Sequence, residues 1–92
     1  MLYEIVIMSQ GGEITCVRQS NGVITHVGIG GWLQPVQTVV YWVQSGVTIF
    51  THRNGRRVQV FARQHPYSKR WFLTTDPDDI LENNLDFLPS CA

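Results

Sequence analysis

The fold of this chain is decided by residues 47–62, VTIFTHRNGRRVQVFA, in which two alternating segments flank Asn54-Gly55. Asn-Gly predicts a type I′ turn, because both central residues of that turn need positive φ. A two-residue loop here pairs Ile49 with Val60 and sorts the apolar side chains onto one face, as a half-buried antiparallel pair requires. That face consists of Val47, Ile49, Val58, Val60 and Ala62. The opposite face carries aromatic and basic side chains and should be exposed.

A second hairpin is predicted at Asn21-Gly22, where the same turn chemistry joins two more apolar segments. A two-residue loop at this point pairs Ile14 with Ile29 and Cys16 with Val27. Cys16 is therefore expected to be a small core residue.

The segment between the hairpins begins with glycine-rich residues 28–31. They lack the spacing of a dinucleotide-binding or phosphate-binding loop, and we expect a flexible connector there. Residues 35–45 then carry valines at positions 36, 39, 40 and 43, the spacing of the apolar stripe of a helix. Pro35 suits the first turn of such a helix, and Gly46 suits the position after its end. The alternative is a strand, because Val-Val-Tyr-Trp-Val favours β structure; the periodicity favours the helix.

Further elements are predicted near both ends of the chain. Leu2–Met8 has the β-branched and aromatic enrichment of a strand. Arg70–Thr75 should form another strand of the sheet, with Trp71 and Leu73 on its buried side. Residues 76–84, which begin with Asp-Pro-Asp-Asp, are expected to form a capped helical turn.

These elements predict an α+β fold: an antiparallel sheet of about five strands, built from hairpins, with one covering helix. Apolar residues make up 43% of the chain and charged residues 15%, which indicates a folded rather than a disordered protein. Residues 1–92 are expected to form a single small domain, since independent domains usually have about 100 to 150 residues.

The two cysteines, Cys16 and Cys91, are too few for a disulfide framework, and no secretory signal precedes them. We therefore expect free thiols in a cytoplasmic protein. No apolar run approaches the roughly 18 residues that a membrane-spanning helix needs, so membrane insertion is not expected.

The second half of the chain carries a recognisable set of motifs: Trp-Phe-Leu-Thr-Thr at 71–75, Asp-Pro-Asp at 76–78, Asn-Asn-Leu at 83–85 and Leu-Pro-Ser-Cys at 88–91. With these motifs, the C-terminal two thirds resemble a small bacterial and phage-borne family known as domain of unknown function 3892. The resemblance implies a small soluble domain. It implies no activity and assigns no functional residue.

The charges are segregated along the chain although the net charge is zero. Six of the seven basic residues lie between positions 53 and 70, where no acidic residue occurs, and five of the seven acidic residues lie between 76 and 86. Aromatic residues alternate with the basic ones, so guanidinium groups could pair with carboxylates or phosphates while the rings stack. The alternative is a solvated hairpin tip balanced by the acidic segment. The predicted partner-binding residues are Arg53, Arg56, Arg57, Arg63, Lys69, Arg70, Phe61 and Tyr67.

Catalytic and metal sites are not predicted. The three histidines and two cysteines lack the close spacing of metal ligands. Asp78 and Asp79 are adjacent carboxylates at a helix start, which fits capping better than acid–base chemistry. Without a convergent nucleophile, base and orienting group, we expect no enzyme and no cofactor.

The sequence thus favours a non-enzymatic small binding protein that occupies a surface of a larger protein or ribonucleoprotein complex. A phage-type inhibitor of a bacterial defence complex would act in this way, by steering and steric occlusion. The alternative function is direct binding of RNA or single-stranded DNA. In either case, reversing the charge of Arg56 and Arg57 is expected to abolish partner binding.

Overall fold

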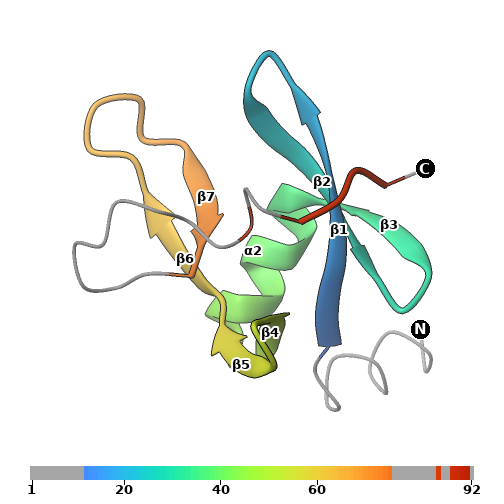
Figure 1. The fold of residues 1–92 in the computed structure, drawn as a ribbon. Coiled ribbons are helices and arrows are strands. Elements are labelled where there is room, and N and C mark those ends of the chain that lie inside the picture. Colours follow the sequence, from blue (N-terminus) through green and yellow to red (C-terminus); the bar gives the residue numbers. More distant parts are fainter. Residues whose placement is uncertain (1–11, 76–84, 86–87, 92) are drawn as a thin grey trace.

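Seven strands and one helix make up the described part of the computed structural model, which covers residues 12–75, 85 and 88–91 (Figure 1). In chain order they are β1 (Gly12–Ser20), β2 (Val23–Ile29), β3 (Trp32–Pro35), α2 (Val36–Gln44), β4 (Ile49–Arg53), β5 (Arg56–Gln59), β6 (Phe61–Gln64) and β7 (Trp71–Thr74). The strand predicted at Leu2–Met8 and the helical turn predicted at residues 76–84 lie outside the described residues.

The strands form two sheets. The larger has five strands in the order β3-β2-β1-β4-β5, and all its neighbours are antiparallel except β1 and β4, which are parallel. The smaller is the antiparallel pair β6-β7. The predicted α+β class is confirmed: within the described residues, one helix accompanies a mostly antiparallel sheet of five strands.

The strand predicted at Arg70–Thr75 forms as β7, but it does not join the main sheet. The backbone N–H of Val60 still donates to the carbonyl of Ile49 at 2.8 Å, beyond the end of β5. The chain then leaves β4, and Ala62 pairs with Leu73 of β7. The prediction of one continuous sheet was wrong here because the strand changes partners at Val60.

The hairpin predicted at Asn54-Gly55 is confirmed. Both turn residues have positive φ, 54° and 77°. Phe50 pairs with Gln59, as a two-residue loop requires. Ile49 and Val60 are each 1% exposed, so the apolar face of the hairpin is directed into the core.

The hairpin predicted at Asn21-Gly22 also forms, but two irregularities in β1-β2 shift its register. Ile14 pairs with Ile29 as expected, whereas Cys16 lies opposite Gly28. A β-bulge adds one residue to a strand, which moves the residues beyond it to the other face. Val17 therefore takes the core position at 3% exposure, and the prediction that Cys16 is a core residue was wrong.

The glycine-rich segment is not a flexible connector. Gly30 and Gly31 have φ of 61° and 83° and form the turn of a third hairpin, between β2 and β3. Gly-Gly is a hairpin signal in its own right, because glycine adopts positive φ without steric cost. This turn makes β3 the edge strand of the main sheet.

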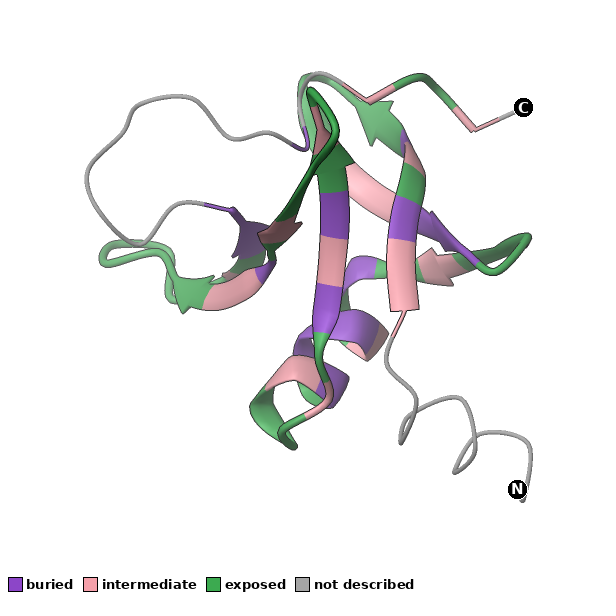
Figure 2. Cartoon of the chain, turned by 60° about the horizontal axis from the view of Figure 1, so that its bottom comes forward, coloured by how far each residue is buried: buried purple, intermediate pink, exposed green. Residues whose placement is uncertain are grey.

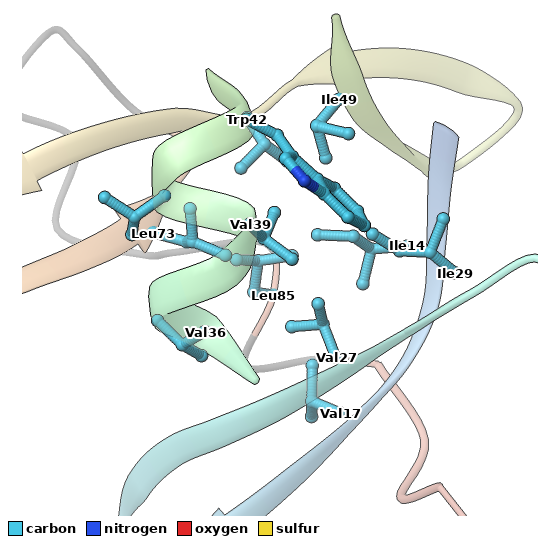
Figure 3. Close-up of a cluster of buried hydrophobic side chains, with 12 residues drawn as sticks. Ile14, Val17, Val27, Ile29, Val36, Val39, Trp42, Ile49, Leu73 and Leu85 are labelled. Carbon is cyan, nitrogen blue, oxygen red and sulfur yellow. The ribbon is translucent and has the colours of Figure 1, made fainter. Parts of the chain in front are cut away.

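The predicted helix is confirmed as α2, which lies between the two sheets (Figure 1). Leu73 of β7 lies on one side of α2, and Val27 and Ile29 lie on the other (Figure 3). Figure 2 shows that the buried residues follow α2 and the strands around it, while the hairpin turns are exposed. The buried apolar side chains are Ile14, Val17, Val27, Ile29, Val36, Val39, Val40, Trp42, Ile49, Val60, Leu73 and Leu85. Among the described residues, no helix is long and apolar enough to cross a membrane.

A buried hydroxyl joins β4 to β1 where their short parallel pairing ends. Thr51 is 1% exposed, and its Oγ1 donates to the carbonyl of Ile14 at 2.9 Å. Val has nearly the same shape, so Thr51→Val should lower the free energy of unfolding by about 1 to 2 kcal/mol through the unsatisfied carbonyl. Urea denaturation measures the difference. The exposed Thr48 is the control, since Thr48→Val should change stability by less than about 0.5 kcal/mol. Equal effects of the two substitutions would contradict a structural role for the Thr51 hydroxyl.

The C-terminal residues return to β1. The N–H of Val17 donates to the carbonyl of Pro89, and the N–H of Cys91 donates to the carbonyl of Val17, each at 2.9 Å. Cys16 and Cys91 are joined by a disulfide across a sequence separation of 75. The prediction of free thiols was wrong, because two cysteines form a bridge when the fold places them on adjacent backbone segments, whatever their number or spacing.

Candidate functional site

The eight predicted partner-binding residues lie on two separate hairpins. Arg53, Arg56 and Arg57 flank the turn of β4-β5, at the bottom of Figure 1. The turn of β6-β7, residues 65–70, lies at the upper left of the same view. The remaining residues belong to this second hairpin: Phe61, Arg63, Tyr67, Lys69 and Arg70. The structure therefore divides one basic stretch of sequence into two basic tips.

The β4-β5 tip interacts with the outer face of its own sheet. The guanidinium carbon of Arg57 lies 3.7 Å from the ring centroid of Phe50, a cation–π contact. The Phe50 and His52 rings meet edge to face at 5.6 Å, and His52 Nδ1 lies 3.0 Å from a carboxylate oxygen of Glu13. Arg57 is thus held over its own sheet, and its strand partner His52 contacts an acidic residue.

The β6-β7 turn holds its charged residues on a fixed backbone. The N–H of Lys69 donates to the carbonyl of His65 at 2.9 Å, and the N–H of His65 donates to the carbonyl of Arg70 at 2.8 Å. Lys69 has a φ of 63°, and the side-chain amide of Gln64 donates to its carbonyl at 2.9 Å. Residues 61–74 contain no acidic residue, and Tyr67 is 90% exposed. The hairpin therefore presents exposed cations and an aromatic ring from an ordered turn.

A groove of about 640 Å³ lies beside this turn. One wall is formed by residues 68–72 and the other by residues 23–26 of β2, and residues 35–37 at the start of α2 line it between them. The side-chain amide of Gln37 donates to the carbonyl of Trp71 at 3.1 Å and ties the start of α2 to β7. The volume falls within the range of about 300 to 1,000 Å³ that is common for binding sites.

The groove carries positive charge. Lys69 and Arg70 line one wall, while no acidic side chain occurs among the described lining residues. The adjoining start of α2 adds to this, since a helix N-terminus carries a partial positive charge. Pro35 caps it without a side-chain hydrogen bond, and the first turn holds no acidic residue. An anionic group would therefore be favoured in the groove over a cationic one.

His26 has a defined orientation in the groove wall. The hydroxyl of Thr25 donates to the carbonyl of Arg18 at 3.2 Å, and His26 Nδ1 lies 2.9 Å from the same hydroxyl oxygen. The contact directs the Nδ1 side of the His26 ring toward Thr25.

The family model described as "Protein of unknown function (DUF3892)" matches residues 13–89. The chain belongs to this family. The match extends the resemblance seen in the C-terminal two thirds to most of the sequence. Comparisons of the chain with curated proteins and with solved structures gave no match.

Several groove residues of this DUF3892 domain were not predicted as site residues. Trp71, which was predicted on the buried side of its strand, is half-buried against the core and also lines the groove together with Phe72. Its position directly after Lys69-Arg70 could have identified Trp71 as a site residue. For Thr25, His26 and Gln37 the sequence offers no signal, because only the tertiary fold brings them to residues 68–72.

The described part of the DUF3892 domain holds no group of three histidine, cysteine or acidic residues that could bind a metal ion. Cys16 and Cys91 line a second, smaller cavity of about 210 Å³ beside Trp32 and Leu33. Their sulfurs are committed to the disulfide, so neither thiol is available as a nucleophile.

Proposed function

We propose that this DUF3892 member is a non-enzymatic binding protein that occupies a surface of a larger protein or ribonucleoprotein complex. The observation that carries the proposal is the β6-β7 turn, whose cations Lys69 and Arg70 line a groove without acidic neighbours among its described lining residues. Such a surface favours an acidic partner and speeds encounter with it. The β4-β5 tip is the weaker candidate, because Arg57 stacks on Phe50.

Binding without chemistry is supported by the composition of the site. The groove joins two cations and apolar side chains to the polar groups of Thr25, His26, Gln37 and Ser68, with no carboxylate among its described lining residues, and the two cysteines are bridged away from it. A protein of this kind acts by steric occlusion, and a phage-type inhibitor of a bacterial defence complex is the use that we propose for it. A cytoplasmic location stays a prediction; the disulfide weighs against it, because disulfides are rare in reducing compartments.

Direct binding of single-stranded RNA or DNA is the second candidate function. It is favoured by the exposed ring of Tyr67 beside Lys69 and Arg70, since bases stack on aromatic side chains while cations pair with phosphates. Its affinity should fall steeply as salt is raised, because each neutralised phosphate releases counterions.

Charge reversal on the two tips tests the proposal. Lys69→Glu/Arg70→Glu should weaken partner binding about tenfold or more at low salt, and the loss should shrink at high salt as the charges are screened. The measurement is retention of host proteins from a lysate on the immobilised domain, with and without nuclease treatment. Lys69→Glu/Arg70→Glu should keep the wild-type melting temperature, because both substituted side chains are exposed.

Arg56→Glu/Arg57→Glu is the matched comparison, with the same change of charge at the other tip. Loss of retention in this variant alone would move the contact to β4-β5 and contradict the assignment to β6-β7. Retention that disappears with nuclease treatment would instead support the nucleic-acid function.

A further inference from the structure

We propose that the groove binds an extended acidic segment of a partner protein, which adds as a strand to the open edge of β2. This inference rests on the proposed binding function and specifies its ligand. Three observations carry it: an unpaired stretch of strand edge, a groove along that edge, and the charge of the opposite wall.

The open edge arises where β3 ends before β2 does. β3 pairs with β2 from Ile29 to His26, and the last pair is His26 with Pro35. After Pro35 the chain turns into α2, whereas β2 continues to Val23. On its other side, Val23 and Ile24 pair with Ser20 and Gln19 of β1, and Thr25 is the extra residue at a register shift. Among the described residues, no strand therefore pairs with residues 23–25 on the β3 side. Such an edge presents backbone donors and acceptors to an incoming strand.

The groove lies along this edge. Residues 23–25 form part of one wall, and residues 68–72 form the wall opposite. An added strand would lie about 4.8 Å from β2, within the groove and in the direction that β3 leaves free. Val23 is 51% exposed, so the wall is open to an incoming chain.

The charges and apolar side chains that line the groove indicate which sequence the bound segment should have. Lys69 and Arg70 face the edge across the groove, and Ile24, Val36 and Trp71 also line it. Because side chains alternate along a strand, acidic residues could meet the cations while apolar residues pack on the aliphatic and indole surface. An alternating acidic and apolar segment therefore fits the groove.

The strand edge favours a peptide over a nucleic acid. Strand addition uses amide N–H and C=O groups at a regular spacing, which a sugar–phosphate backbone lacks. A nucleic acid could use the cations and rings of the turn, but it would leave the backbone groups of residues 23–25 unpaired.

The probe for the test is a short fluorescein-labelled peptide of alternating glutamate and valine, and its binding to the intact domain is measured by fluorescence anisotropy. We expect saturable binding that weakens about tenfold in Lys69→Glu/Arg70→Glu and to a similar degree in Val23→Glu, because both place negative charge in the groove. Tyr41→Glu is the control for an added acid, since Tyr41 is 63% exposed on α2 and does not line the groove. A lysine–valine peptide and an oligothymidylate of similar length should bind at least about tenfold more weakly.

Backbone amide hydrogen exchange then locates the contact. With the glutamate–valine peptide bound, amides within residues 23–25 should become protected, as expected for a strand edge that gains a neighbour. Binding without this protection, or binding that Val23→Glu leaves unchanged, would overturn strand addition while leaving the proposed binding function intact. Preferential binding of the oligothymidylate would overturn the choice of ligand. Insensitivity of both probe binding and lysate retention to Lys69→Glu/Arg70→Glu would remove the proposed function itself.

Discussion

Replacing both cysteines, in Cys16→Ser/Cys91→Ser, should lower the free energy of unfolding by about 2 to 4 kcal/mol. The bridge closes a loop with a sequence separation of 75, which restricts the unfolded chain strongly. It also holds residues 89–91 beside β1, where Val17 bonds the chain on both sides of Ser90. Urea denaturation under oxidising conditions gives the difference in stability.

Reduction provides the control for this prediction. Dithiothreitol should destabilise the wild-type protein to about the level of the double serine variant and should leave that variant unchanged. Cys16 and Cys91 are half-buried residues that line a surface cavity, so we expect the reductant to reach the bridge. Equal stability of the oxidised and reduced wild type would contradict a stabilising bridge.

Gly28→Ala should lower the free energy of unfolding by about 1 to 3 kcal/mol, because the new methyl group would overlap the disulfide. A Cβ at position 28 would fall inside contact distance of Cys16 Sγ and only 3.2 Å from Cys91 Sγ. Gly28 lies opposite Cys16 in the β1-β2 pair, so neither strand can move aside without disturbing the ladder. Thermal and urea denaturation measure the effect.

A double-mutant cycle separates this overlap from the general cost of changing a strand residue. In a Cys16→Ala/Cys91→Ala background both sulfurs are gone, and the cost of Gly28→Ala should fall below about 1 kcal/mol. The same cost in both backgrounds would show that the sulfurs are not what position 28 must accommodate.

Turn residues and the periodicity of apolar residues were sufficient to predict much of the fold. Asn-Gly predicted two hairpins, because both residues of that pair adopt positive φ easily. The spacing of the valines predicted the helix α2, although the residues of this segment favour β structure individually. Gly30-Gly31 carried the same kind of turn signal, so β3 could have been predicted as well. These features depend on residues close together in the sequence.

Features that depend on distant contacts were not predictable. The register shifts in the β1-β2 pair moved Cys16 off the core face, and no residue pattern distinguishes that register from the regular one. The disulfide needed the C-terminal residues to return to β1. The basic stretch 53–70 is free of acidic residues in the sequence, but the change of strand partners at Val60 divided it between two hairpins. The groove arises only when residues 23–26 and 68–72 meet across the start of α2.

We propose that this domain binds its partner in the groove beside Lys69 and Arg70. The most direct test compares the wild type with Lys69→Glu/Arg70→Glu for binding of the glutamate–valine peptide at low salt, with Arg56→Glu/Arg57→Glu measured in parallel. We expect a loss of affinity of about tenfold or more for the first variant and a much smaller loss for the second, whose charges lie outside the groove. Equal affinity of the wild type and Lys69→Glu/Arg70→Glu, with both folded, would contradict it.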